Sequence, residues 1–335
     1  MSRSALSTLG HALGRGADLA LDRTVAPGYS RLGIGLRRRL PGWPADPGAG
    51  SLAGRHVVVT GASSGLGTAT AEGLAALGAT VHLVVRDLEK GARVRDELAA
   101  RRAGATYHLW RCDVGDLDDV RRFAAEILAE VPRLDAVVHN AGVMPPERTT
   151  SAQGHELSMA VHVLGPALMT ELLLPALRAG RTEGGTSRVV LVTSGGMYSQ
   201  ALPADDLEYE RGAYSPSTAY ARSKRVQVEM LEPLAERWRA AGLEVHATHP
   251  GWADTPGVAE SLPGFQRVTR PVLRDAVQGA DTTVWLVAHA TPLPSGRLWH
   301  DRRRRPAHLL RRTVPTPAQV EQTWSWVRTA AQLEG

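Results

Sequence analysis

Short apolar runs alternate with longer amphipathic stretches between residues 56 and 300. Runs rich in valine, leucine and alanine are typical of buried strands, whereas longer stretches with apolar positions three or four apart are typical of helices. Strands are predicted at 56–60, 79–86, 106–114, 134–142, 187–194, 243–251 and 296–300. Helices are predicted at 65–77, 87–102, 116–130, 152–179, 217–241, 273–290 and 316–332.

This regular alternation predicts an α/β fold, a single domain with a doubly wound parallel sheet of about seven strands covered by helices on both faces. Residues 41–54, PGWPADPGAGSLAG, are rich in proline and glycine and indicate a linker. We therefore expect a basic N-terminal extension with its linker at 1–53, the domain at 54–300 and a basic C-terminal tail with a helix at 301–335.

Cysteine usage and hydropathy set the expected environment. The one cysteine, Cys112, excludes an internal disulfide and a cysteine-based metal site, so we expect no metal and a reducing, cytoplasmic setting. The chain has no run of eighteen apolar residues and no convincing secretory signal, so a membrane span is not expected.

The net charge of +5 is concentrated at the two ends of the chain. Residues 1–50 hold seven arginines against three acidic residues, and so do residues 301–335. We interpret the runs at 37–39 and 302–305 as solvated arginine clusters, with contact to an anionic membrane surface as the weaker alternative. No nucleic-acid partner is expected, because no aromatic interleaving or DNA-binding motif accompanies them.

A glycine-rich turn follows the first predicted strand. The segment TGASSGLG, Thr60–Gly67, joins that strand to its helix, which is where a dinucleotide-binding turn lies. Its glycines would let the backbone approach a pyrophosphate, and the helix N-terminus would favour that anion. The residues predicted to cradle the cofactor are Gly61, Ser63, Ser64, Gly65, Leu66 and Gly67. A plain strand–helix turn is the alternative.

The spacing T-G-x-x-x-G-x-G resembles that of the short-chain dehydrogenase/reductase (SDR) family, which has a Rossmann-type fold and binds NAD(P). The resemblance covers about residues 54–300 and implies further cofactor contacts at Asp113, Val114, Asn140, Ala141, Gly142, Pro250, Gly251 and Thr255. The segments SGGMYSQ, HPGWADTPGV, QGADTTVWL and PSGRLWHDR are most similar to the group typified by dehydrogenase/reductase SDR family member 12.

The residue after the second strand distinguishes the two nicotinamide cofactors. Arg86 stands where an arginine suits the 2′-phosphate of NADP(H), because its guanidinium fork pairs with phosphate. Asp87 follows directly and would suit the ribose diol of NAD(H) instead. We expect NADP(H), with NAD(H) as the alternative.

The family resemblance assigns the chemistry to Ser194, Tyr220 and Lys224. Tyr220 and Lys224 lie four residues apart on one predicted helix face, so a lysine ammonium would favour the phenolate and lower the pKa of the tyrosine. Ser194 would hold the substrate oxygen. His162 stands where the family commonly has an asparagine in a proton path; we expect it to keep the relay and to add a pH dependence near its own pKa, or else to be a tolerated replacement.

The substrate is expected to be a small-molecule carbonyl compound or alcohol. Two loops, 195–219 and 252–274, contain apolar residues and would shape the substrate mouth, which suggests a lipophilic ketone, aldehyde or secondary alcohol. The alternative is that these residues only pack the loops. A rival hypothesis is a non-catalytic, cofactor-binding member acting through partner or membrane contacts. The resemblance also implies a homo-oligomer, with a monomer as the alternative.

Overall fold

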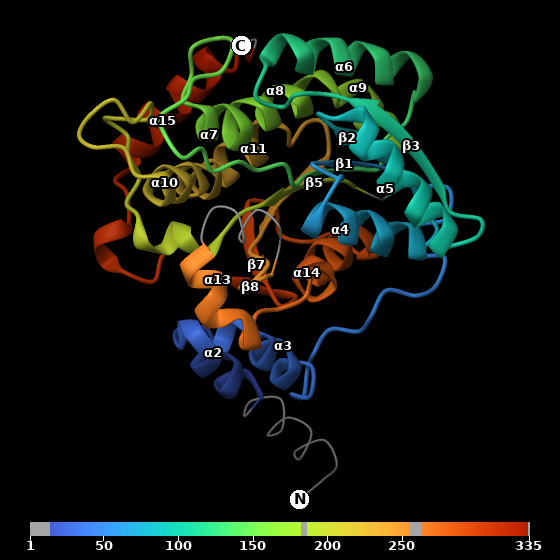
Figure 1. Ribbon diagram of the computed structural model, residues 1–335, viewed down its shortest axis with the longest axis horizontal. Helices are drawn as coiled ribbons and strands as arrows, with labels where there is room; N and C mark the ends of the chain where they lie inside the picture. Colours follow the sequence, from blue (N-terminus) through green and yellow to red (C-terminus); the bar gives the residue numbers. More distant parts are fainter. Residues whose placement is uncertain (1–13, 182–185, 255–262, 334–335) are drawn as a thin grey trace, which may run out of the picture.

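The computed structural model describes residues 14–181, 186–254 and 263–333. At its centre is an eight-stranded sheet in the order β3-β2-β1-β4-β5-β6-β7-β8 (Figure 1). Every pair is parallel except β7–β8. The strands are β1 His56–Thr60, β2 Thr80–Val85, β3 Thr106–Arg111, β4 Ala136–His139, β5 Ser187–Val192, β6 Leu243–Thr248, β7 Arg297–His300 and β8 Arg303–Arg305. The predicted doubly wound sheet is confirmed, with β8 as an added antiparallel edge strand.

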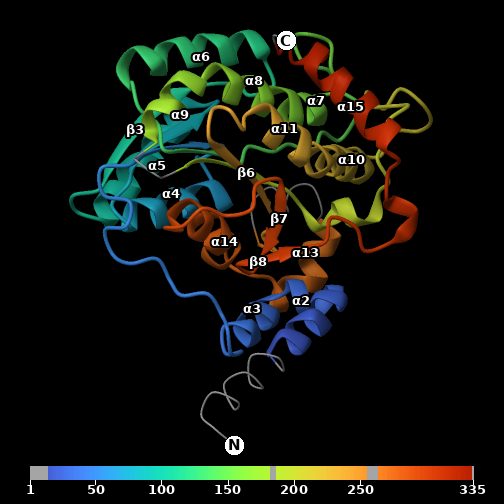
Figure 2. The same ribbon diagram turned by 180° about the vertical axis from the view of Figure 1, so that it is seen from behind.

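Helices cover both faces of the sheet and enclose two hydrophobic cores. They are α2 Val25–Tyr29, α3 Arg31–Arg37, α4 Gly65–Ala76, α5 Leu88–Arg101, α6 Leu117–Glu130, α7 Leu157–Met159, α8 Gly165–Leu172, α9 Leu174–Gly180, α10 Pro216–Glu229, α11 Leu231–Arg237, α13 Pro263–Thr269, α14 Ala276–Ala288 and α15 Pro317–Ala330. Residues 14–23 are also helical. Figures 1 and 2 show α4, α5 and α14 on one face, and α6, α8 and α11 on the other.

Two helices predicted as continuous are broken in the structure, each next to a proline. Pro175 and Pro233 lack an N–H group, and each ring crowds the carbonyl four residues earlier. Accordingly α8 ends at Leu172 and α10 ends at Glu229. A π-helical turn, Ala160–Leu164, precedes α8. No single described helix is long and apolar enough to cross a bilayer; the bent pair Leu157–Leu172 and Leu174–Gly180 meets that test by length and composition only.

The two ends of the chain pack closely against the domain. β8 extends the sheet beyond residue 300, and α15 buries Val327 and Ala331 in the same core as α6 and α8. The α2–α3 pair lies at the base of the molecule beside α13 in both views (Figures 1 and 2). The family resemblance places a homo-oligomer interface on the helices that follow the fourth and fifth strands. Helix α15 packs against the first of these, because Val327 borders the same small cavity as Pro166 of α8.

The basic runs at the two ends are not uniformly solvated. Arg37 and Arg305 are at most 8% exposed, and both pair with the buried Asp18. Asp301 receives hydrogen bonds from Arg37 at 2.6 Å and from Arg274 at 2.6 and 2.9 Å. The interpretation of these runs as solvated clusters is wrong for Arg37, Arg305 and Arg302, because carboxylates far away in the sequence meet them inside the fold.

Candidate active site

The glycine-rich turn between β1 and α4 is closely packed against the turn after β4. Gly61 has a φ of 65°, and a Cβ atom there would lie 2.8 Å from the Cα of Ala141. A Cβ at Gly67 would lie 2.2 Å from the carbonyl oxygen of Gly61. Neither position has room for a side chain, so both glycines are required by the geometry of the turn.

The predicted cofactor contacts in this turn lie at the N-terminus of α4. Ser64 is the N-cap residue, but its side chain does not cap the helix. The side chains of Ser63, Ser64 and Leu66, like Gly65, are partly exposed. The first backbone N–H groups of α4 and the positive end of its dipole point to a place that suits a pyrophosphate. Cofactor contact by these residues stays a prediction.

Asn140, Ala141 and Gly142 form the facing turn, and Thr60 joins the two turns. The Thr60 hydroxyl accepts hydrogen bonds from the backbone N–H groups of Asn140 and Ala141, at 3.0 and 3.1 Å. The Asn140 amide donates to the carbonyl oxygens of Thr60 and Gly61, at 3.0 and 3.2 Å. Thr60 lies in the quoted motif but was not among the predicted site residues; a hydroxyl at a strand end is the only local signal for it.

At the opposite end of the predicted cofactor site, Arg86 is exposed, whereas the neighbouring carboxylate already has a partner. Asp87 is the N-cap of α5 and accepts a hydrogen bond from the backbone N–H of Lys90 at 3.0 Å. Asp113 accepts from the backbone N–H of Gly115, and Val114 is buried beside it. These positions follow β2 and β3 at the carboxyl edge of the sheet, where an open α/β fold binds its ligand.

Ser194, Tyr220 and Lys224 meet at the carboxyl end of β5. Ser194 follows the strand, and its hydroxyl lies close enough to the Tyr220 phenol to favour the phenolate. The Lys224 ammonium lies 5.7 Å from the centre of the Tyr220 ring and donates to the carbonyl oxygen of Val192 at 2.8 Å. The predicted trio is thus assembled by β5 and α10, with Tyr220 partly exposed and Lys224 buried.

The electrostatics of this trio differ from the expectation. Burial raises the pKa of Tyr220, although the Ser194 hydroxyl acts in the opposite direction. Burial also lowers the pKa of Lys224 to about 7, because its described partners are neutral oxygens. The expected lowering of the Tyr220 pKa by Lys224 is therefore wrong for the chain alone, and its phenol stays protonated at neutral pH.

His162 lies in the π-helical turn with both ring nitrogens in hydrogen bonds. Its Nε2 accepts from the backbone N–H of Val143 at 3.0 Å, so the ring proton resides on Nδ1. Nδ1 donates to the Ser223 hydroxyl at 2.7 Å, which in turn donates to the Tyr220 carbonyl oxygen. Burial and the nearby Lys224 hold the pKa of His162 well below its ordinary value. His162 is therefore neutral at neutral pH, and the expected pH dependence near its own pKa stays a prediction whose pH range is shifted well below the ordinary value for histidine.

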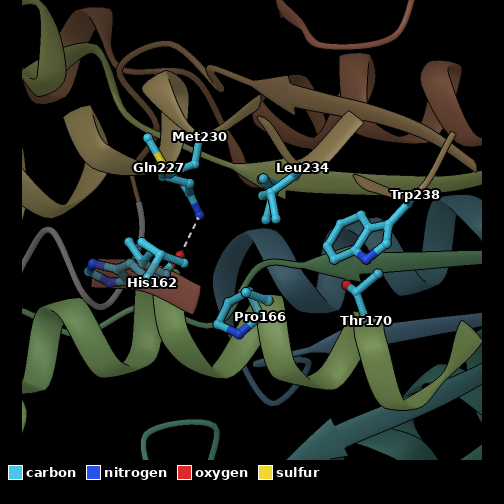
Figure 3. Close-up of a pocket in the computed structure, with 11 residues that line it drawn as sticks. His162, Pro166, Thr170, Gln227, Met230, Leu234 and Trp238 are labelled. Carbon is cyan, nitrogen blue, oxygen red and sulfur yellow. Dashed lines mark hydrogen bonds between the residues drawn. The ribbon is translucent and has the colours of Figure 1, made fainter. Parts of the chain in front are cut away.

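Gln227 links Lys224 to the backbone of His162. Its side-chain amide donates to the carbonyl oxygen of His162 at 3.0 Å, and its oxygen lies 3.5 Å from the Lys224 ammonium (Figure 3). Beyond these residues lies a small, mainly apolar cavity bordered by Met230 and Trp238. Gln227 was not predicted, although its position one turn after Lys224 places both side chains on one helix face.

The turn predicted to lie beside the nicotinamide is held by the N-terminal segment. Gly251 has a φ of 80°, and its N–H donates to Nδ1 of His249 at 3.0 Å. The carbonyl oxygen of Tyr29 accepts from the N–H of Trp252 at 2.8 Å, and Arg274 donates to the carbonyl oxygen of Pro250 at 3.3 Å. Residues 28–30 thus support the Pro250–Gly251 turn. Thr255, also predicted to contact the cofactor, lies outside the described residues.

The two predicted substrate loops are largely packed. In 195–219 the apolar side chains Met197, Tyr198 and Leu207 are buried in the core. In the second loop Trp252 is partly buried against the same core, and residues 255–262 lie outside the described ranges. The apolar residues of the first loop therefore mainly pack the loop against the core, which was the alternative to their lining a substrate mouth.

Comparisons with known proteins agree with this geometry. The short chain dehydrogenase family model matches residues 55–264. Dehydrogenase/reductase SDR family member 12 from Bos taurus is 38% identical over 273 residues, which are 80% of this chain and 83% of the bovine protein. Retinol dehydrogenase 12 from Homo sapiens is 34% identical, over 76% of this chain and 79% of the human protein. A structure described as a short chain dehydrogenase from Escherichia coli CFT073 complexed with NADPH is 26% identical, with a TM-score of 0.60 over 77% of this chain and 100% of that chain.

Proposed function

The chain belongs to the short-chain dehydrogenase/reductase family, and within it we propose an NADP(H)-dependent enzyme for lipophilic carbonyl compounds and alcohols, with Tyr220 as the general acid and base. Family membership makes the chain an NAD(P)-dependent oxidoreductase acting on CH–OH and C=O groups. The observation that carries the proposal is the convergence of Ser194, Tyr220 and Lys224 at the carboxyl end of β5.

The residues of the chain divide the work of reduction. The cofactor, when bound, supplies the hydride to the carbonyl carbon. The Ser194 hydroxyl donates a hydrogen bond to the substrate oxygen, and Tyr220 donates its proton to the alkoxide that develops there. A raised pKa keeps Tyr220 protonated at neutral pH, so the proton to be transferred is present before the alkoxide develops. Lys224 donates a hydrogen bond to the Val192 carbonyl oxygen and lies on the same face of α10 as Tyr220.

The preference for NADP(H) follows from the contrast between Arg86 and Asp87. The Asp87 carboxylate is engaged in capping α5, whereas the exposed Arg86 has no ion pair among the described residues. A free guanidinium fork at this place suits a 2′-phosphate. Changing Arg86 to alanine is expected to raise the KM for NADPH by about 10- to 100-fold, in line with the loss of a charge-assisted contact of about 1.5–3 kcal/mol.

NADH would serve as the internal comparison, because its KM should change little in the Arg86→Ala enzyme. The Arg93→Ala variant is the control for a general loss of positive charge, because Arg93 is an exposed arginine on α5 that pairs with Glu89. Equal losses with NADPH and NADH would contradict the assignment of Arg86.

The lipophilic substrate class rests on two supports. A relative named retinol dehydrogenase acts, by its name, on a lipophilic alcohol. Trp252 follows the Pro250–Gly251 turn and is only partly buried, and we take its exposed part as an apolar contact for such a substrate. A panel of aliphatic and aromatic ketones and aldehydes, each offered with NADPH and with NADH, tests this class directly.

Turnover of that panel by a Tyr220→Phe variant tests the mechanism. Loss of the proton donor is expected to lower kcat by about 10²- to 10⁴-fold. Tyr107→Phe is the matched control, because the Tyr107 hydroxyl on β3 has no hydrogen-bond partner. Undiminished turnover by Tyr220→Phe would refute the mechanism even if NADPH still bound.

A further inference from the structure

The N-terminal helices expose large apolar side chains that no described part of the chain covers. Leu19, Leu32 and Leu36 are 59%, 57% and 49% exposed. Leu32 and Leu36 are one turn apart on α3, so they project from one face, while Ile34 and Arg37 are buried on the opposite face. Val268 on the neighbouring α13 is 80% exposed. Exposed apolar residues gathered on adjacent elements indicate an interaction surface.

Charges on the same helices are sorted by sign. The two acidic residues of 14–40, Asp18 and Asp22, are 4% and 3% exposed and face Arg37 and Arg305 inside the fold. The exposed charges of this range are all cationic: Arg15, Arg23, Arg31, Arg38 and Arg39. Two further exposed arginines, Arg267 and Arg270, flank Val268, and 263–272 contains no acidic residue. Within 14–40, Arg38 pairs with Asp281 at 2.8 Å, whereas Arg15, Arg23, Arg31 and Arg39 have no ion pair among the described residues. The arginines of α5, by contrast, have carboxylate neighbours.

We propose that this surface docks the protein on an anionic lipid membrane. We call it the basic face: Leu19, Leu32, Leu36 and Val268 with Arg15, Arg23, Arg31, Arg39, Arg267 and Arg270. Leucines inserted at the headgroup boundary, ringed by arginines that contact lipid phosphates, are the features of interfacial helices. A nucleic acid fits less well, because it would leave the leucines in water and finds no aromatic platform on these residues.

The basic face adjoins the substrate side of the active site. Residues 28–30 hold the Pro250–Gly251 turn, and α13 follows that turn in the chain. Both ribbon views show α13 between the α2–α3 pair and the rest of the domain (Figures 1 and 2). Resting on the proposed function, this arrangement places the substrate mouth beside the bilayer that would hold a lipophilic substrate.

Vesicle co-sedimentation of the full chain tests the proposal. The probes are vesicles of phosphatidylcholine alone and vesicles that also contain phosphatidylserine, at low and at high salt. Binding is expected with phosphatidylserine and at low salt only. Arg23→Gln/Arg31→Gln/Arg39→Gln should weaken that binding roughly 100-fold, taking about fivefold for each arginine near the surface. Leu32→Ser/Leu36→Ser should also weaken the low-salt binding, because it removes the apolar side chains that would insert at the headgroup boundary.

Helix α5 supplies the matched control. It carries the exposed Leu88, the exposed Arg93 and Arg101, and the partly exposed Arg95; all three arginines have carboxylate neighbours. The variant Leu88→Ser/Arg93→Gln/Arg95→Gln/Arg101→Gln should bind vesicles like the unaltered chain. None of the altered side chains is buried, so thermal unfolding should confirm intact folds.

Three outcomes would overturn the proposal: no sedimentation with phosphatidylserine vesicles, an equal loss in the α5 variant, or binding to a nucleic acid in place of vesicles. The result is separable from the enzymatic proposal. Reduction of a water-soluble ketone by NADPH should be unchanged in the basic-face variants, whereas vesicle binding should be unchanged in Tyr220→Phe.

Discussion

Two regions of the molecule bury cationic side chains, one with a carboxylate partner and the other without. At the base, Arg37 and Arg274 are each 1% exposed, and Asp301 receives hydrogen bonds from both. At the active site, Lys224 is 2% exposed, but its described hydrogen-bond partners are the oxygens of Val192 and Gln227, which carry no charge. The chain uses arginine where a carboxylate is supplied and one of its two lysines where none is.

The pKa values reflect this difference. Burial would raise the pKa of Asp301, but the neighbouring cationic groups hold it well below its usual range, so its charge is permanent. Burial lowers the pKa of Lys224 to about 7, so its charge is adjustable at neutral pH. Paired buried charges hold the structure in place. An unpaired buried ammonium lowers stability, but it can release and take up its proton near neutral pH. The contrast separates a structural cluster, Arg37, Arg274 and Asp301, from the proposed catalytic group, Ser194, Tyr220 and Lys224.

The largest effect is expected from breaking the structural cluster. Asp301→Asn keeps the shape of the side chain and tolerates the φ of 49° at this position, but leaves Arg37 and Arg274 without their shared anion. The free energy of unfolding should fall by about 3–5 kcal/mol, measured by urea denaturation. Asp205→Asn, in an exposed pair with Arg211, is the control and should cost less than about 1 kcal/mol. Equal costs for the two variants would show that burial does not distinguish these pairs.

The next largest effect on stability is expected at Lys224, where substitution should stabilise the chain rather than destabilise it. The folded pKa of Lys224 is about 7, below its ordinary value of 10.5, so between these values the unfolded chain binds more protons and stability rises with pH. Below pH 7 the full penalty of the buried ammonium is present. Lys224→Met should therefore be more stable than the unaltered chain at pH 6. That margin should shrink by about 1.4 kcal/mol per pH unit between pH 7 and 9.

Lys90, the other lysine of the chain, is exposed and provides the control for this measurement. Lys90→Met should change stability little, and its effect should not vary between pH 6 and pH 9. A margin for Lys224→Met that stays constant with pH would mean that the buried lysine does not titrate in this window, and the contrast with the arginines would lose its electrostatic basis.

The sheet and the reactive trio were predictable because their signals are local. The strands are short runs of valine and leucine, and parallel strands bring Ser194 and the glycine-rich turn to one edge whatever the loops between them. Motif spacing then places Tyr220 and Lys224 on one helix face. The helix breaks at Pro175 and Pro233 had a local signal as well, but the apolar periodicity on both sides concealed it.

The structural cluster had no such signal. Arg37 meets an aspartate 264 residues later, and neither residue lies in a recognisable motif. A run of arginines in the sequence therefore suggested solvated side chains, when three of them are buried by contacts between distant segments. Similarly, the pKa of Tyr220 depends on how completely neighbouring atoms exclude water, which residue spacing does not reveal.

The smallest effect is expected at His162, a buried base that differs from Lys224 in carrying no charge. Its low pKa and its bonds to Val143 and Ser223 keep it neutral, so His162→Asn should leave the pH–rate profile for carbonyl reduction unchanged between pH 6 and 8.5. Turnover should change by only a few-fold, through the position of Tyr220. Stability adds a second readout. Because the folded pKa of His162 is depressed, the unaltered chain should become less stable as the pH falls below about 6.5, the ordinary pKa of histidine, whereas the variant should not show this loss. An acid limb in the rate profile that disappears in His162→Asn would show that His162 titrates, and would place it with Lys224 among the proton-carrying groups.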